Sequence, residues 1–441
     1  MLGSLVLLVL FLFFFIRNNN KGISAIIIIS LLNDMFAFSF GFSLPIHYLI
    51  SLAFLPKITY QYKLIPLKAK RLLAPIYLEL FYLAFLAVFF GFIFPWESKF
   101  DYQRTWSQKA EGRAIIQIIK LISEIGLVLL LLLWLNTKQI TVNYLLKVTS
   151  IVIISSVIFT FIDLFFGLKS ILFSDLREVE GRFTALNVEP RSFGRICSFV
   201  LLLLISFNNS SKSNIIKGGI LFSSIGIIIS LSASTYVMTL VWIVFYIFII
   251  KKYKFFLIGI PILFVLLFFL NQNEFFREQT LKKIEATSAQ DKDSEQKEKV
   301  NDNEPELFSS FEVFDRAALN FLYNEPMYFI TGTGPNLISI PSSPYITASA
   351  YTIYENRIDS VPHTFIINLI SRSGLIGLLI WIVFFFKFKN NSKVLNKEQQ
   401  ALFVCTMIAY FIVATSFFLF IIAILSYNIS KSSKKKIKLN D

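Results

Sequence analysis

Three arginines stand close together in the sequence, directly before an apolar stretch. Arg191 and Arg195 are four residues apart, Arg182 lies upstream, and Glu189 stands between them. Residues four apart share one face of a helix, and a guanidinium binds phosphate oxygens through two parallel hydrogen bonds. The free N–H groups of a helix start also favour an anion. We interpret the segment as a candidate diphosphate-binding site.

A structural role is the alternative for these arginines. Arg191 and Arg195 could extend to the membrane–water interface, or pair with Glu189 and Asp163. The spacing alone does not separate this interpretation from phosphate binding.

His363 is the second candidate for chemistry. It follows Pro362 at the start of another apolar stretch and is one of only two histidines. A neutral imidazole can accept the proton of a sugar hydroxyl near neutral pH. A capping or interfacial role is the alternative. The other histidine, His47, lies within an apolar stretch, and we expect it to be structural.

Three carboxylates lie within or near apolar stretches, where ionisable residues are functional candidates by default. Glu79 is expected to pair with Arg71 near the end of its helix. Glu124 and Asp163 could orient an arginine or bind hydroxyls of an acceptor.

All of these candidate residues lie in or beside predicted membrane helices. The apolar fraction is 55%, the mean hydropathy is +0.66, and there are 50 phenylalanines. One crossing takes about 20 apolar residues. The sequence therefore predicts an all-α polytopic membrane protein with about 11–13 transmembrane helices, near 2–16, 23–33, 36–55, 72–94, 114–135, 148–168, 193–207, 215–231, 234–250, 255–270, 364–386 and 399–428.

Basic residues indicate the orientation of these helices. The loop 57–71 carries lysines and an arginine without an acid, so we expect it to be cytoplasmic. The basic residues behind the net charge of +14 would then lie mostly in cytoplasmic loops, where they anchor the helices, and would not form a nucleic-acid-binding surface. Residues 1–16 are expected to be a retained anchor. Residues 23–55 and 399–428 are each expected to form a hairpin of two short helices.

The predicted organisation has four parts. Membrane helices fill 1–270, and a large external loop covers 271–362. Helices return over 363–428 and a basic cytoplasmic tail follows over 429–441. Within the loop, the charged stretch 285–306 is expected to be disordered. The stretch 307–330, which includes Arg316, has apolar residues at helical spacing. It is expected to be an amphipathic helix that is ended by Asn324–Pro326, with a turn at Gly332–Pro335 after it.

Motifs for other chemistry are missing from the sequence. It has no Gly-rich ATP-binding loop and no cluster of His, Cys and carboxylates at metal-ligand spacing. We therefore expect neither a cofactor nor a metal, and an activated diphosphate linkage would supply the energy. Cys197 and Cys405 both lie in predicted membrane helices, so a disulfide framework is not expected.

With these features together, the chain resembles the bacterial O-antigen polymerase and O-antigen ligase superfamily. Three motifs carry the resemblance, together with the many helices and the large late loop. They are the arginine segment Asn187–Gly194, the loop helix and glycine turn from Phe314 to Gly334, and the histidine-bearing helix start from His363 to Gly377.

The resemblance implies an inverting, metal-independent glycosyltransferase of the bacterial inner membrane, with its site facing the periplasm. Its donor would be a glycan linked to undecaprenyl diphosphate, and membrane lipid and a chain-length regulator would be its other partners. Arg191 and Arg316 would hold the diphosphate, and His363 would orient or deprotonate the acceptor hydroxyl. Arg182, Arg195 and Arg372 would make secondary contacts, with Arg372 the deepest along its helix.

We expect a polymerase that transfers the growing chain onto a lipid-linked repeat unit. The nearest alternative is a ligase that transfers it to lipid A-core, because both would use the same donor chemistry. A flippase of lipid-linked oligosaccharide is the alternative of another class, and a nonenzymatic scaffold is a further one. A flippase should carry charge along a central path, whereas the sequence gathers charge at one membrane face.

Overall fold

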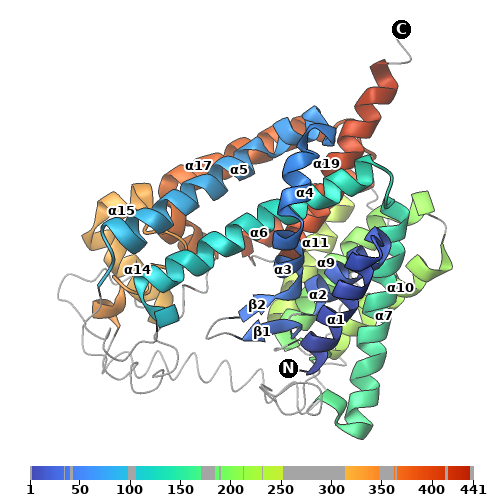
Figure 1. The fold of residues 1–441 in the computed structure, drawn as a ribbon, viewed down its shortest axis with the longest axis horizontal. Helices are drawn as coiled ribbons and strands as arrows, with labels where there is room; N and C mark the ends of the chain where they lie inside the picture. Colours follow the sequence, from blue (N-terminus) through green and yellow to red (C-terminus); the bar gives the residue numbers. More distant parts are fainter. Residues whose placement is uncertain are drawn as a thin grey trace.

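The computed structural model describes twelve segments, and almost all of them are helical. They are residues 2–33, 35–39, 43–97, 106–169, 184–187, 190–211, 213–230, 232–251, 313–346, 362, 365–412 and 416–437. Their helices pack into one bundle, with the first helix near the bottom and the last helix rising at the top of the view (Figure 1).

Five of the described helices are long and apolar enough to cross a membrane. They are α5 (Leu67–Val88, continued by the π-helix η2, Phe89–Ile93), α6 (Ala110–Asn136), α7 (Val142–Phe166), α9 (Pro190–Ser211) and α17 (Phe365–Ser392). A 27-residue apolar stretch such as Leu67–Ile93 is about 40 Å long, more than the ~30 Å hydrocarbon core. The chain thus has the helices of a multi-pass membrane protein.

The long helices and several shorter ones pack into two groups. α1 packs on α2, α2 on α7, and α10 on α7 and α9, while α5 packs on both α6 and α17, and α19 packs on α5 and α6. In Figure 1, α5 and α17 lie at the upper left and α1, α2, α7 and α10 at the right, with α6 running across the view. The shorter elements are α1 (Leu2–Ile16), α2 (Asn20–Leu32), α10 (Asn214–Ile229), α11 (Ala233–Ile250), α18 (Lys397–Ile412) and α19 (Ser416–Ile437). The predicted span 255–270 lies outside the described residues.

The prediction of a membrane helix over 36–55 is wrong. β1 (Ala37–Ser39) pairs with β2 (Ser43–Pro45) as an antiparallel hairpin, and two short helices follow, α3 (Ile46–Ala53) and α4 (Leu55–Tyr60). Phenylalanine occupies every second position from 36 to 42, which is the period of a strand. Pro45 then fits the last position before a helix, where no helical N–H is needed.

The described part of α18 ends at Ile412 and α19 begins at Ser416, and residues 413–415, where the break within 399–428 is predicted, lie outside the described residues. α19 then continues to Ile437, so the lysines Lys434–Lys436 belong to a helix and not to a separate tail. Three short 3-10 helices are also described, η1 (Tyr62–Leu64), η4 (Trp106–Gln108) and η6 (Ser343–Tyr345).

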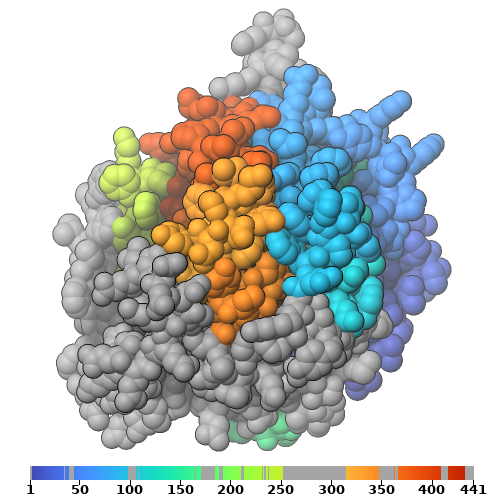
Figure 2. Space-filling model, turned by 90° about the vertical axis from the view of Figure 1, so that its left-hand side faces the viewer, coloured from blue at the N-terminus to red at the C-terminus, as the bar shows by residue number. Residues whose placement is uncertain are grey.

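The described part of the predicted amphipathic segment 307–330 has the expected helix, which ends at Asn324 as predicted, and a second short helix follows it. α14 (Val313–Asn324) ends where Pro326 begins α15 (Pro326–Thr331), because proline has no N–H for a continuous helix. α14 buries Ala318, Phe321 and Leu322 against Ile338 and Ile367. Figure 2 shows this orange segment on the surface beside the cyan start of α6. The stretch 285–306 lies outside the described residues.

Candidate functional site

The arginine motif lies at the start of α9. Pro190 opens this helix and Arg191 belongs to its first turn, so the predicted helix start is present. Arg195 is half-buried one turn later, and α9 packs on α7, α10, α11 and α18. Arg182, Glu189 and His363 lie outside the described residues. The side chain of Arg191 does as well.

A buried lysine holds the segment that leads into α9. The Lys169 ammonium donates to the Thr184 hydroxyl and to the Asn187 carbonyl, the latter at 3.0 Å. The Asn187 amide in turn donates to the Leu32 carbonyl at 3.4 Å. Asp163 accepts a 2.6 Å hydrogen bond from the Lys169 backbone N–H, so it closes the end of α7. These contacts fix the approach to Arg191 between α2 and α7.

The second and third motifs meet at a break in α17. Gly374 has φ 62° and ψ −166° inside this helix, while Gly332 and Gly334 have φ of 79° and 93°. A Cβ on Gly374 would lie 2.1 Å from the Ile330 carbonyl oxygen, and one on Gly332 would lie 2.6 Å from the Arg372 carbonyl oxygen. Only glycine fits such a left-handed, backbone-to-backbone contact.

Hydrogen bonds join the glycine turn to the broken helix. The Thr333 N–H donates to the Ser371 carbonyl at 2.8 Å, and the Gly334 N–H donates to the Arg372 carbonyl at 3.1 Å. The Thr333 hydroxyl also donates to the Ser371 carbonyl, at 2.8 Å. Irregular backbone within a membrane bundle needs such partners. The turn at Gly332–Pro335 therefore fills the break in α17.

Neighbouring helices hold the same turn from the other side. The Tyr82 hydroxyl of α5 donates to the Thr331 carbonyl at 2.5 Å, and the Trp96 indole donates to the Thr333 carbonyl at 3.3 Å. Arg113 at the start of α6 donates to the Asn336 carbonyl and the Ser339 hydroxyl. Three helices, α5, α6 and α17, and the loop residue Trp96 thus converge on residues 331–339.

An aromatic cluster supports the loop helices beside this turn. Trp96 lies edge-on to Phe321 and Tyr328, with ring centroids 5.9 and 5.1 Å apart, and Phe321 stacks on Tyr328 at 5.4 Å. Burial, with a smaller contribution from the Glu325 charge, raises the pKa of the Tyr328 phenol. The phenol therefore stays neutral and packs as an aromatic ring.

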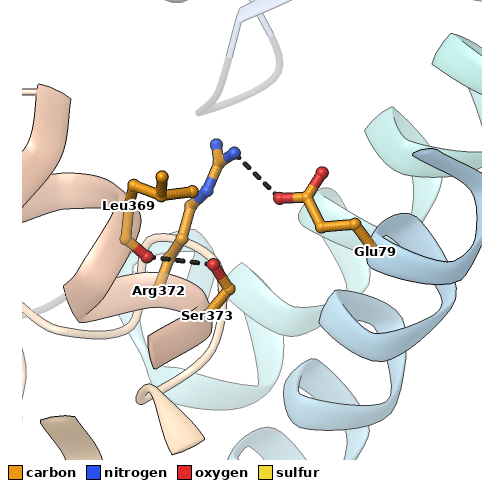
Figure 3. A network of polar contacts seen from close by, with 4 residues as sticks. All are labelled: Glu79, Leu369, Arg372 and Ser373. Carbon is orange, nitrogen blue, oxygen red and sulfur yellow. Dashed lines mark hydrogen bonds and ion pairs between the residues drawn. The ribbon is translucent and has the colours of Figure 1, made fainter. Parts of the chain in front are cut away.

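Arg372 points from the break in α17 toward α5. Its guanidinium lies 3.0 Å from the Glu79 carboxylate (Figure 3), and the two side chains are 17% and 2% exposed. The expected pair between Glu79 and Arg71 is therefore wrong. Arg71 is eight residues earlier, or about 12 Å along the same helix axis, whereas α17 packs directly on α5.

Further polar groups surround this ion pair. Glu124 of α6 lies within electrostatic range of Arg372, Glu79 and Lys120. Its carboxylate accepts a 2.9 Å hydrogen bond from the Tyr48 hydroxyl, which also lies 3.0 Å from the Ser416 hydroxyl. Two acids and two bases thus balance in the interior, on α5, α6 and α17.

Arg316 lies in α14 and is half-buried. α14 packs on both α15 and α17, so the loop helix that bears Arg316 is fixed to the helix that follows His363 in the sequence. Among the residues that the structure describes, no group of three His, Cys, Asp or Glu side chains could hold a metal ion.

Sequence reasoning missed the residues that assemble this site. Tyr82, Trp96, Arg113 and Lys169 each hold backbone of a distant or irregular segment. Trp96 and Arg113 stand at the ends of predicted membrane helices, where polar and aromatic residues facing a loop are a usable signal. No protein-family model matches the chain, and no curated protein is significantly similar to it.

Proposed function

We propose that the chain is a membrane glycosyltransferase that extends a surface polysaccharide. It would transfer a growing glycan from undecaprenyl diphosphate to a lipid-linked repeat unit. One observation supports this most strongly: the glycine turn of the second motif is hydrogen-bonded to the helix of the third motif, through Ser371 and Arg372. Segments separated in sequence, and selected for their resemblance to one family, are in contact.

In the proposed reaction an acceptor hydroxyl attacks the anomeric carbon that bears the diphosphate. His363 takes the hydroxyl proton as the new C–O bond forms. The bond from the anomeric carbon to the diphosphate oxygen breaks on the opposite side, with inversion. Undecaprenyl diphosphate then leaves with its electron pair, and Arg191 and Arg316 neutralise the developing charge.

The contacts around the first motif suit this role for Arg191. Lys169 and Asn187 fix the backbone just before the start of α9. The first turn of a helix offers free N–H groups and a positive dipole end to an anion. A diphosphate at this helix start would bind both the backbone and the arginine fork.

A deletion strain of the source organism tests the proposal. If the strain loses the polymer and keeps only acceptors capped with a single repeat, the protein is a polymerase. Expression of the protein from a plasmid should then restore the ladder of polymer lengths on a gel. Long unattached polymer would instead indicate the ligase. Arg191→Ala or His363→Ala proteins that restore a full ladder would remove the proposed mechanism.

A lipid-linked oligosaccharide flippase is a second candidate, and one observation favours it. The interior holds charged residues on α5, α6 and α17, with Glu79 and Arg372 in contact, whereas the sequence had suggested charge at one face only. Ionisable residues inside membrane proteins often mark substrate pathways. Transport of lipid-linked repeats across liposome membranes without a new glycosidic bond would favour this alternative.

A further inference from the structure

Two charged side chains on separate membrane helices meet inside the bundle. Glu79 of α5 is 2% exposed and lies 3.0 Å from the guanidinium of Arg372 on α17. A carboxylate in such surroundings is costly unless it is paired. The pair is therefore a fixed point between α5 and α17.

Arg372 is held through its backbone as well as its side chain. Its carbonyl accepts the Gly334 N–H at 3.1 Å, and it stands two residues before the non-helical Gly374. The side chain extends toward Glu79 of α5 (Figure 3), while the carbonyl binds the glycine turn. Arg372 thus connects the broken helix to both neighbours.

One face of α5 holds both sides of the break. Glu79 and Tyr82 are three residues apart and share a helix face. Glu79 binds the Arg372 side chain, and the Tyr82 hydroxyl donates to the Thr331 carbonyl at 2.5 Å. Leu86, one turn further, lies beside Gly334, where an added Cβ would be 3.4 Å from its carbonyl oxygen. One face of α5 therefore contacts both the glycine turn and the break in α17, and it holds them in place relative to each other.

We propose that Glu79 is a positioning residue for glycan transfer. Through Arg372 it would fix the first half of α17, which begins two residues after His363, relative to the loop helix that bears Arg316. This inference rests on the proposed function. Glu79 need not touch the substrate, and its effect is on the geometry of the reacting groups.

A variant that removes only one of the interior charges leaves an unbalanced charge, so the test of the Glu79–Arg372 pair also needs a variant that removes both partners. Removing Glu79 alone leaves Arg372 and Lys120 facing one acid, Glu124. Removing Glu79 and Arg372 together leaves one acid and one base, and replacing both partners of a buried pair is often tolerated. The double variant Glu79→Leu/Arg372→Met is therefore expected to fold, and it tests the role of the pair without an excess charge.

Thiol labelling at position 371 reports on the break independently of activity. Ser371 is buried, and its hydroxyl has no hydrogen-bond partner among the described residues, so Ser371→Cys is a mild change. The two native cysteines are buried. In this background we expect Glu79→Gln to accelerate maleimide labelling about tenfold or more, because local opening exposes the site.

Chain extension is measured on the same purified proteins with lipid-linked repeats extracted from the deletion strain. Glu79→Gln should lower kcat about tenfold to a hundredfold with little change in KM, because Glu79 does not bind the repeat. Glu79→Asp should lie between it and the wild type, since it keeps the charge. Glu398→Gln, at the start of α18, is the matched control and should change neither readout.

The outcomes separate this inference from the proposed function. Faster labelling together with a lower kcat supports positioning by Glu79. Unchanged labelling, unchanged kcat, or a double variant that extends chains like the wild type overturns it, while wild-type extension leaves the proposed function intact. A folded wild-type protein that extends no chains overturns the proposed function and the positioning role together.

Discussion

The guanidinium of Arg113 donates hydrogen bonds to the Asn336 carbonyl at 2.9 Å and to the Ser339 hydroxyl at 2.6 Å. Arg113 is only 7% exposed, and Ser339 only 3%. The start of α6 is therefore tied to the chain that follows the glycine turn. A lysine has a single ammonium in place of the planar fork and cannot reproduce this geometry.

Arg113→Met is expected to destabilise the loop attachment. It leaves the half-buried Asn336 carbonyl and the buried Ser339 hydroxyl without their charged donor, which costs about 1–3 kcal/mol. Thermal unfolding in detergent should shift to lower temperature, with faster proteolysis within 313–346. Arg71→Met is the control, because Arg71 is exposed. Equal stability of the two variants would contradict a structural role for the Arg113 contacts.

Gly374→Ala is expected to disrupt the junction of α17 with the glycine turn. The positive-φ backbone alone (φ 62°, ψ −166°) costs a non-glycine residue about 1–3 kcal/mol. The new Cβ would also lie only 2.1 Å from the Ile330 carbonyl oxygen. Gly218→Ala in α10 is the matched control, since its Cβ would meet only Ile154 at 3.3 Å. The thermal unfolding temperature and the rate of chain extension should both be lower for Gly374→Ala than for the wild type. Both should be unchanged for Gly218→Ala.

Hydrophobicity made the membrane bundle predictable, because one crossing requires a long apolar run whatever its neighbours are. The long helices α5, α6, α7, α9 and α17 lie close to their predicted ranges. The prediction of a membrane helix over 36–55 was wrong because hydropathy does not distinguish a helix from an apolar hairpin. The alternation of phenylalanines was the better signal there.

The contacts of the site could be predicted only in part. The glycine turn and the helix start at Arg191 follow from local sequence, because glycine and proline restrict the backbone locally. The partner of Glu79 does not, since Arg372 lies 293 residues away and only the packing of α17 on α5 brings them together. The predicted convergence of Arg191, Arg316 and His363 involves side chains outside the described residues and stays a prediction.

Lys169→Met is expected to weaken glycan transfer through the first motif. The Asn187 carbonyl and Thr184 hydroxyl lose their donor, so the approach to α9 loosens and Arg191 is less well placed. We expect kcat to fall about tenfold or more, since small misplacements of reacting groups are costly. Lys217→Met, at an exposed position, should extend chains normally. Full activity of Lys169→Met would show that this anchor is dispensable.

Arg191→Lys is expected to impair transfer although it keeps the charge. A lysine ammonium cannot donate two parallel hydrogen bonds to a diphosphate. We expect a loss on the order of tenfold to a hundredfold in chain extension, with thermal unfolding unchanged. Arg17→Lys, at an exposed position after α1, serves as control. Equal extension by both variants would argue against diphosphate binding by Arg191.

The most direct measurement uses the purified chain in liposomes, supplied with lipid-linked repeats and no metal or nucleotide. We expect longer lipid-linked glycans, with one undecaprenyl diphosphate released for each new glycosidic bond, and loss of both products in His363→Ala. Properly folded protein that yields neither product, or that moves the repeats across the membrane without joining them, would contradict the proposed function.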